Sequence, residues 1–330
     1  MNINMNKQNK SKGNTLCTGR PRYKPFLKWI GGKTQIIGDI MKKIPTEINN
    51  YHELFLGGGS VLFAILSLQK QNKITINGKI YAYDINEQLI NVYKHVQNNK
   101  DALFHYISYY IHEYDNIKGT VINRKPLTIE EAKTSKESYY YWIREKFNKY
   151  KKNKFCENLD NSIEYSALFM FLNKTCFRGM YREGPNGYNV PYGHYKKTPT
   201  IITKDDLDNI SELIKDVEFI CADFNTSMKN TKFKIDDFIY FDPPYAPIKS
   251  TSFVKYNIDG FDLETHKKLF NAILKLNKKK IKFLMSNAKV KLVLEYFDQQ
   301  KFNYEEIIAR RAINSKNPES TVIEVLINNL

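Results

Sequence analysis

Residues 51–69 read YHELFLGGGSVLFAILSLQ and combine a strand, a glycine turn and a helix. Aromatic and apolar residues from Tyr51 to Leu56 predict the strand, which ends at Gly57-Gly58-Gly59. The apolar residues from Val61 to Gln69 then predict a helix, and a second strand follows that ends at Asp84. This β-turn-α-β order predicts an α/β fold, a doubly wound sheet whose strands are connected by helices.

The rest of the chain continues this pattern around a stretch of different character. Further apolar segments predict strands at 217–221, 238–241, 281–285, 304–309 and 322–327. Residues 95–215 instead carry amphipathic helical patterns and little strand signal. We therefore expect one domain from residues 23–94 and 216–330, interrupted by a mainly helical insertion at 95–215. Residues 1–22 are polar, basic and aperiodic, which predicts a disordered arm.

The composition favours a polyanionic partner. The chain has 330 residues with 51 Lys plus Arg against 35 Asp plus Glu, a formal net charge of +16. Such an excess supplies the sequence-independent part of nucleic-acid binding. No apolar run approaches the ~18 residues of a membrane span, and no secretory signal opens the chain. The four cysteines are far apart and lack a C-x-x-C spacing, so we expect an intracellular protein with no disulfide framework and no metal.

The tetrapeptide Asp242-Pro243-Pro244-Tyr245 follows the strand predicted at 238–241. Two prolines remove two N–H donors and fix φ, so nearby carbonyls are held outside the strand ladder. A carboxylate and a fixed carbonyl together accept both hydrogens of an exocyclic amine, and the tyrosine offers a face for stacking. These are the parts of a site that grips the amino group of an extruded nucleobase. The alternative is a strand that ends at a Pro-Pro turn with an exposed tyrosine.

The glycine turn and two acids indicate a cofactor site. Gly57 and Gly59 match the first part of a dinucleotide fingerprint, but Leu62 replaces its third glycine, which argues against NAD or FAD. Asp84 ends the next strand. Its distance along the chain from the glycine turn is close to the ~20 residues at which an acid meets ribose hydroxyls. An acid and an aromatic, Asp223-Phe224, follow a further strand. The combination fits S-adenosylmethionine, a nucleoside without a diphosphate; helix caps at both acids and a core phenylalanine are the alternatives.

The loop 176–195 is dense in glycine, proline, aromatic and basic residues. Arg178 and Arg182 are suited to bidentate pairing with guanine, and Phe177 is suited to wedge into the stack where a base leaves it. A basic surface loop that contacts phosphates only is the alternative. Near the start of the predicted domain, Lys28-Trp29 and Lys33 flank a Gly-Gly turn; a core tryptophan and solvated lysines are the alternative there.

With these motifs in place, the chain resembles the Dam-like, alpha-group DNA adenine-N6 methyltransferases. The resemblance covers roughly residues 25–330 and rests on four motifs in the family's order. The motifs are residues 26–33, 53–61, 173–195 and 242–245, and Ser286-Asn287 and Arg310-Arg311 extend the similarity. It implies a Rossmann-like methyltransferase sheet with a DNA-recognition insertion.

The resemblance also implies roles for individual residues. The catalytic residues would be Asp242, Pro243, Pro244 and Tyr245. The S-adenosylmethionine pocket would be lined by Trp29, Lys33, Phe55, Gly57, Gly59, Ser60, Asp84, Asp223, Phe224 and Asp242. Double-stranded DNA would be contacted by Lys28, Phe177, Arg178, Met180, Arg182, Asn189, Pro191 and Tyr195.

The chain departs from the family pattern at three places. Leu54 stands where many relatives have proline, Arg178 stands where GATC-specific relatives usually carry asparagine, and the loop between Arg182 and Asn189 is slightly shorter than in some relatives. We expect methylation of adenine in a short target, GATC first and CATG second. An RNA adenine methyltransferase, a DNA cytosine-N4 methyltransferase and a non-catalytic DNA-binding relic are the alternatives; Asp242 in place of serine favours adenine. We also expect a monomer or weak dimer, located with DNA in a cytoplasm, nucleoid or viral replication site, that acts alone or is paired with a restriction endonuclease.

Overall fold

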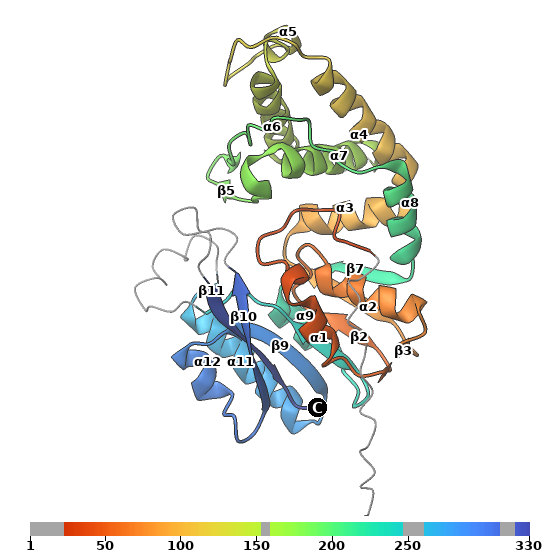
Figure 1. Cartoon of the computed structure of the whole chain (residues 1–330), viewed down its shortest axis with the longest axis vertical. Coiled ribbons are helices and arrows are strands. Elements are labelled where there is room, and N and C mark those ends of the chain that lie inside the picture. Colours follow the sequence, from red (N-terminus) through yellow and green to blue (C-terminus); the bar gives the residue numbers. More distant parts are fainter. Residues whose placement is uncertain (1–22, 153–158, 247–260, 311–320) are drawn as a thin grey trace, which may run out of the picture.

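The computed structural model describes residues 23–152, 159–246, 261–310 and 321–330 (Figure 1). The arm predicted at 1–22 and Arg311 therefore lie outside the described residues. Helices alternate along the chain with the strands of a central sheet, as the sequence predicts. None of the helices within the described ranges has the length and apolar character that a membrane span requires.

A seven-stranded sheet in the order β10-β11-β9-β8-β2-β4-β7 forms the centre of the fold. Its strands are β2 (Tyr51–Glu53), β4 (Ile80–Asp84), β7 (Val217–Cys221), β8 (Phe238–Phe241), β9 (Lys282–Ala288), β10 (Asn303–Arg310) and β11 (Thr321–Asn328). Five strands are parallel, while β11 runs antiparallel to both β9 and β10. The predicted α/β fold is thus confirmed as a Rossmann-like, mostly parallel sheet.

Helices cover both faces of this sheet. One face carries η1 (Lys33–Gln35), α1 (Ile37–Met41), α2 (Ser60–Lys70) and α3 (Glu87–Asn98), and the other carries α9 (Phe224–Asn230), α11 (Leu263–Lys278) and α12 (Lys291–Tyr296). Strand β8 is buried throughout: Phe238 and Tyr240 join the first core, and Ile239 and Phe241 join the second. A parallel strand covered on both faces needs such a continuous apolar run.

The strand order reverses between the neighbours β2 and β8. From β2 the chain proceeds to β4 and β7 on one side, and from β8 it proceeds to β9 on the other. In open α/β sheets, ligands bind at the carboxyl ends of the strands at this switch point. The predicted strand at 51–56 ends early, at Glu53, but Leu54 N still donates to Tyr240 O and Leu56 N to Tyr83 O. These two bonds anchor the start of the glycine turn to both neighbouring strands.

The insertion is mainly helical and lies beside the α3 face of the sheet (Figure 1). It contains α4 (Lys100–Asp115), α5 (Ile129–Ala132), α6 (Lys136–Lys152), α7 (Leu159–Thr175), η3 (Phe177–Gly179), α8 (Lys204–Leu213) and the hairpin β5 (Glu183–Gly184) and β6 (Gly187–Tyr188). A two-stranded ladder of β1 (Glu47–Ile48) and β3 (Thr75–Ile76) adds to the sheet domain. Helix α3 packs against α7 and α8, and one buried cluster continues from the sheet into the insertion. The boundaries at 94/95 and 215/216 stay a prediction.

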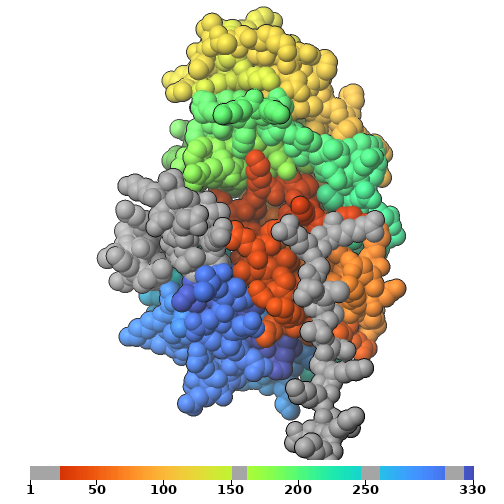
Figure 2. Space-filling model, viewed as in Figure 1, coloured from red at the N-terminus to blue at the C-terminus, as the bar shows by residue number. Residues whose placement is uncertain are grey.

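Figure 2 shows how the N-terminal segment connects these parts. On this face the red residues lie between the yellow and green insertion and the blue C-terminal strands. Lys28 and Trp29 contact the insertion, at Asn173 and at Phe169 and Tyr181 respectively. Lys33 contacts Asp242 at the end of β8.

Candidate active site

The glycine turn lies at the carboxyl edge of the sheet and has the backbone geometry that glycine favours. Gly57 has φ 49° and Gly59 has φ 69°, both in the left-handed region. A Cβ at Gly57 would lie 2.9 Å from the Trp29 ring, and one at Gly59 would lie 2.7 Å from the Tyr93 hydroxyl. Side chains are therefore excluded at both positions, and the turn brings bare backbone to the sheet edge.

Asp84 supports this turn from the end of β4. Its Oδ2 accepts from Gly57 N at 2.9 Å and its Oδ1 accepts from Asn86 N at 2.9 Å. Burial raises the pKa of the Asp84 carboxyl, against the lowering effect of these backbone donors. The helix-cap alternative is wrong for Asp84 itself, because Asn86 is the N-cap of α3 and accepts from Leu89 N. A carboxylate has about four lone-pair sites, so Asp84 keeps room for a further donor.

Asp223 and Phe224 have the capping and core roles that stood as alternatives. Asp223 caps α9 by accepting from Asn225 N and Thr226 N. Phe224 is buried and its ring centroid lies 5.9 Å from that of Phe55. Both residues nevertheless lie at the carboxyl end of β7, on the same edge as the glycine turn, so capping and ligand contact are compatible.

Asp242 leaves β8 and forms an ion pair with Lys33. The Lys33 Nζ lies 2.8 Å from Asp242 Oδ1 and donates to Gly31 O at 2.6 Å. Ser60 Oγ accepts from the backbone N of Lys33 at 2.9 Å, which ties η1 to the start of α2. Lys33 is 4% exposed, so the interpretation of this lysine as solvated is wrong. Burial raises the pKa of Asp242 to about 6, although Lys33 opposes the rise.

Tyr245 lies over the same ion pair. The Lys33 Nζ is 4.8 Å from the centroid of its ring. The Tyr245 hydroxyl donates to Glu324 Oε2 at 2.7 Å, and the next backbone N, that of Ala246, donates to Asn287 Oδ1 at 3.2 Å. Tyr245 is thus half-buried and hydrogen-bonded, unlike the exposed tyrosine of a simple turn. Pro243 is buried and Pro244 is exposed.

Glu53 is a residue near the site that the sequence prediction missed. It is 2% exposed at the end of β2 and accepts a 2.7 Å hydrogen bond from the Tyr51 hydroxyl. Burial raises the pKa of Glu53 to about 8, and the nearby charge of Asp242 adds to the rise. The sequence did contain a signal for Glu53, because it is an acid within an apolar strand that leads to the glycine turn. Burying a carboxylate costs free energy unless the group is paired or functional.

Lys28 and Trp29 join the sheet domain to the insertion. The Trp29 ring stacks near Phe169 and Tyr181, with centroid distances of 6.5 Å and 5.8 Å. The Asn173 side chain accepts from Lys28 N at 2.9 Å and donates to Lys28 O at 2.7 Å. Trp29 therefore touches the glycine turn on one side and the insertion on the other, which couples the two.

The predicted recognition loop begins where Lys28 meets the insertion. The Lys28 Nζ donates to the Tyr195 hydroxyl at 3.1 Å, and a Cβ at Gly179 would overlap the Lys28 side chain at 2.3 Å. Lys174, at the end of α7, was missed by the sequence prediction. Burial and the charge of Lys28 lower its pKa to about 8. Lys28 and Lys174 thus place two neighbouring positive charges beside the loop.

Within the loop, the side chains predicted to contact DNA are mostly at the surface. Phe177 is 43% exposed, and Arg178 has φ 58° with its guanidinium 5.2 Å from the Phe177 ring centroid. Arg182 Nε donates to Asn189 Oδ1 at 2.6 Å, so each of these side chains restrains the position of the other. Phe177 N donates to Pro191 O at 2.8 Å, which closes the two ends of the loop.

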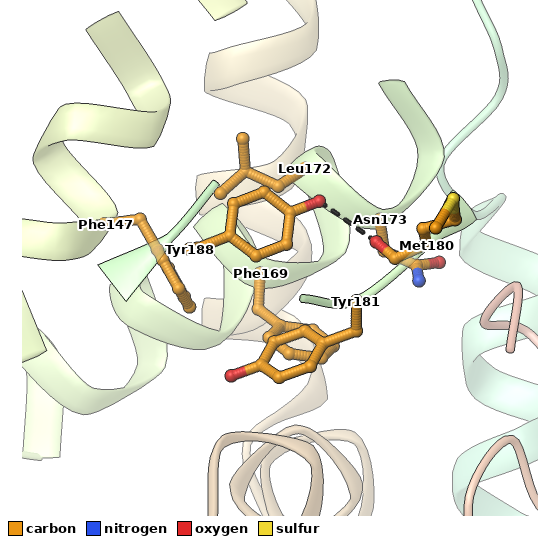
Figure 3. Close-up of a pocket in the computed structure, with 7 residues that line it drawn as sticks. All are labelled: Phe147, Phe169, Leu172, Asn173, Met180, Tyr181 and Tyr188. Carbon is orange, nitrogen blue, oxygen red and sulfur yellow. Dashed lines mark hydrogen bonds between the residues drawn. The ribbon is translucent and has the colours of Figure 1, made fainter. Parts of the chain in front are cut away.

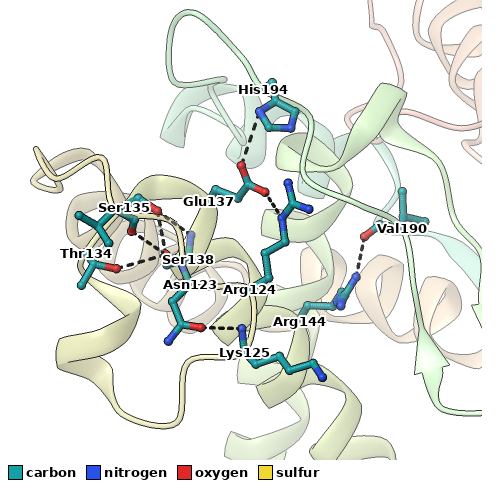
Figure 4. A network of polar contacts seen from close by, with 11 residues as sticks. Asn123, Arg124, Lys125, Thr134, Ser135, Glu137, Ser138, Arg144, Val190 and His194 are labelled. Atoms are coloured by element: carbon teal, nitrogen blue, oxygen red, sulfur yellow. Dashed lines mark hydrogen bonds and ion pairs between the residues drawn. The ribbon is translucent and has the colours of Figure 1, made fainter.

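Helix α6 fixes the second half of this loop (Figure 4). The buried Glu137 carboxylate lies 2.7 Å from Arg124 Nε and 3.7 Å from His194 Nδ1. Val190 O accepts from Arg144 at 3.3 Å and from the Tyr140 hydroxyl at 2.8 Å. Tertiary contacts therefore set the shape of the loop, in addition to its glycines and prolines.

A small cavity beneath the loop is no ligand site. It holds about 10 Å³, close to the volume available to one water molecule. Aromatic and apolar side chains line it, and the Tyr188 hydroxyl donates to Met180 O at 3.2 Å beside it (Figure 3). Met180 is half-buried within the loop, and this hydrogen bond holds its backbone in place. The cavity indicates only imperfect packing between the loop and α7.

The predicted cofactor and catalytic residues therefore meet at one edge of the sheet, and the predicted DNA-contacting residues form a second group on the insertion. Lys28, Trp29 and Lys33 connect the two groups. A largely buried carboxylate, a lysine and an aromatic ring meet at the switch point, a combination suited to holding an amine. Within the described residues, no group of three or more His, Cys, Asp or Glu side chains is arranged to hold a metal ion.

Comparison with known proteins identifies the family. The family model for the D12 class of N6 adenine-specific DNA methyltransferases matches residues 29–313, and the chain belongs to this family. It is 36% identical to the type II methyltransferase M.MjaIII of Methanocaldococcus jannaschii, over 93% of this chain and 99% of that protein. It is 30% identical to M1.LlaDCHI of Lactococcus lactis (96% and 99%) and 28% identical to the DNA adenine methylase of Escherichia coli K12 (93% and 95%).

The chain is thus an enzyme that methylates the N6 amino group of adenine in DNA, as its resemblance to the Dam-like family predicts. The same findings argue against the three alternatives, which were an RNA adenine methyltransferase, a DNA cytosine-N4 methyltransferase and a non-catalytic DNA-binding relic. A methyl donor and a DNA substrate follow from the reaction.

Proposed function

We propose that the enzyme takes its methyl group from S-adenosylmethionine, bound at the carboxyl edge of β2, β4 and β7. The residues there fit this cofactor. The glycine turn presents backbone without side chains, Asp84 has carboxylate lone pairs for ribose hydroxyls, and Phe55 and Phe224 offer apolar faces for an adenine. When bound, the cofactor supplies an electrophilic methyl group on a sulfonium. Trp29, Lys33, Ser60 and Asp223 complete the proposed pocket.

On the substrate side, we propose that Asp242 and Tyr245 hold a flipped adenine, because the N6 nitrogen is otherwise buried in base pairing. Tyr245 stacks on the base. The Asp242 carboxylate and the Pro243 carbonyl accept the two amine hydrogens, so the nitrogen lone pair is drawn out of conjugation with the ring. Pro244 rigidifies the turn. Positioning and electrostatic stabilisation then supply most of the rate acceleration.

One observation carries this mechanism: the ion pair of Lys33 and Asp242 beside the Tyr245 ring. An acceptor for a neutral amine works best as a carboxylate. Burial alone favours the protonated acid, and Lys33 opposes that effect. Lys33 therefore supports the ionised form of Asp242 at neutral pH, in a place from which water is largely excluded.

We further propose that the insertion reads the target, with GATC as the first candidate and CATG as the second. Arg178, Arg182 and Phe177 are exposed on a loop whose backbone is held by Lys28 and α6. Met180, Asn189, Pro191 and Tyr195 support or extend this surface. The enzyme acts inside the cell on double-stranded DNA, as a monomer or weak dimer, alone or paired with a restriction endonuclease.

The test is methylation of plasmid DNA by the purified protein with S-adenosylmethionine. After digestion to nucleosides, mass spectrometry should detect N6-methyladenine, and the plasmid should resist a GATC-cutting enzyme. Asp242→Ala should remove most of the activity and spare cofactor binding in a calorimetric titration. Asp39→Ala, which removes an exposed carboxylate paired with Lys42, is the matched control. Wild-type methylation by Asp242→Ala would refute the mechanism, and resistance to a CATG-cutting enzyme alone would replace the first target.

A further inference from the structure

Tyr245 is held from a strand outside the parallel part of the sheet. Its hydroxyl donates to Glu324 Oε2 at 2.7 Å. Glu324 lies on β11, the antiparallel strand, opposite Ala288 at the carboxyl end of β9. The two residues come from distant parts of the chain, and the strand order of the sheet brings them together.

The Glu324 carboxylate has the properties of a dedicated partner for this hydroxyl. In the described parts of the chain, no lysine or arginine nitrogen lies within 4 Å of it, unlike Glu306 on β10, which pairs with Lys289 at 2.5 Å. The side chain is half-buried and its charge is close enough to the active site to raise the pKa of Asp242. A phenol that donates to a carboxylate forms a charge-assisted hydrogen bond, about twice as strong as a neutral one.

The hydrogen bond fixes the orientation of the ring. The phenolic O–H lies in the ring plane because the oxygen is conjugated with the ring, so an acceptor at a fixed place restricts both the tilt and the rotation of the ring. The backbone beside Tyr245 is already fixed, since Ala246 N donates to Asn287 Oδ1 on β9. Glu324 therefore restrains the hydroxyl end of the Tyr245 side chain, while the adjacent backbone is already held in place.

We propose that Glu324 is a positioning residue that sets the ring of Tyr245 for stacking on the target adenine. This inference rests on the proposed role of Tyr245 in holding the flipped base. Glu324 itself does not touch the reacting atoms. Small misplacements of a positioning group cost large factors in rate, because the bound geometry must already be close to that of the transition state.

The experiment measures kcat, KM and base flipping for variants of both partners. Tyr245→Phe removes the donor and Glu324→Ala removes the acceptor, and each should lower kcat about tenfold with little change in the KM for S-adenosylmethionine. The double variant should lose no more than either single variant, because both remove the same bond. Glu324→Gln keeps an acceptor oxygen and should lose less than threefold. Glu306→Gln, the same change on the neighbouring strand, should leave kcat unchanged.

Two further readouts extend the rate measurements: base flipping reports the positioning of Tyr245, and the acid limb reports whether the Glu324 charge lies close to Asp242. The fluorescence of 2-aminopurine placed at the target adenine should show a smaller or less ordered flipped population in Glu324→Ala than in the wild type. The acid limb of the kcat profile should move to lower pH in Glu324→Gln, because a charge that raises the pKa of Asp242 is removed. Glu306→Gln should not move it.

The outcomes distinguish this inference from the proposed function. If Tyr245→Ala keeps wild-type activity, the proposed base-holding role of Tyr245 is wrong. If Tyr245→Ala is inactive but Glu324→Ala keeps wild-type kcat, or if the two single losses multiply in the double variant, the positioning role of Glu324 is overturned. Should Glu324→Ala fail to fold, the kcat and the 2-aminopurine fluorescence of Tyr245→Phe, which removes the same hydrogen bond from the other partner, give the same decision.

Discussion

The substitution Lys33→Met tests the central ion pair most directly. The Lys33 Nζ lies 2.8 Å from Asp242 Oδ1, and the side chains are 4% and 18% exposed. A cation this close lowers the pKa of a carboxyl by about 1–3. The pKa of Asp242 is about 6 with Lys33 present, because burial outweighs the lysine. Without the lysine we expect a pKa of at least about 7.

The sign follows from the role of the carboxylate. In its proposed role, Asp242 accepts the amine hydrogens best when it is ionised, so activity should fall as the pH falls through its pKa. At pH 7 roughly nine-tenths of the wild-type enzyme is ionised at Asp242, against about half or less of the variant. Folding should respond as well. Removing one partner leaves an uncompensated buried charge, which costs about 3–5 kcal/mol, and this cost applies above the new pKa and diminishes below it.

The assay is the pH dependence of kcat with thermal unfolding at pH 5.5 and 8.5. The acid limb should move from near pH 6 to pH 7 or above in Lys33→Met, and the loss of stability should be larger at pH 8.5. Lys42→Met is the matched control, because Lys42 pairs with Asp39 at the surface, where such pairs contribute little. An acid limb that stays at the wild-type pH in Lys33→Met would refute the reasoning, since Lys33 would then not control the ionisation of Asp242.

Two other substitutions test the residues around the glycine turn. Glu53→Gln should stabilise the protein increasingly as the pH rises from about 4.5 to 8, by a few kcal/mol at most, because the folded pKa of Glu53 is raised to about 8 and its ionisation opposes folding. Chemical unfolding at pH 5 and 8.5 measures this, and an equal effect at both pH values would contradict it. Gly59→Ala should cost about 1–3 kcal/mol and weaken S-adenosylmethionine binding in a calorimetric titration, because a Cβ there meets the Tyr93 hydroxyl at 2.7 Å with φ at 69°. Gly38→Ala, where a Cβ meets nothing within 4 Å, should not destabilise the protein.

Local patterns predicted most of the elements. The strands at 217–221 and 238–241 lie where the apolar runs place them, and the helix after the glycine turn differs by one residue at each end. The apolar runs predict these strands correctly because a parallel strand buried on both faces needs uninterrupted apolar residues. The strand that begins at Tyr51 was predicted too long. Leu54 and Leu56 are buried apolar residues at the start of the glycine turn, but their backbone hydrogen bonds lie outside the regular strand ladder.

The polar contacts of the site were beyond sequence patterns. The local pattern left open whether Lys33 is solvated or lines the cofactor pocket, and it gave no role to Glu53 or Glu324. The missing information is the order of the strands, because hydrophobic periodicity says which residues are buried but not which strands are neighbours. The motif at 242–245 was recognisable because its chemistry is local.

The sequence by itself determined an α/β protein of basic composition, with a glycine turn at one strand end and the tetrapeptide Asp242-Pro243-Pro244-Tyr245 at another. Those features are contiguous in the chain, so residue type and spacing suffice to define them. The tertiary structure decided that β2 and β8 are neighbours at the switch point, that Lys33 neutralises Asp242, and that Glu324 holds Tyr245. Each of these contacts joins segments far apart in sequence, and only the packing of the whole sheet brings their charges within reach of one another.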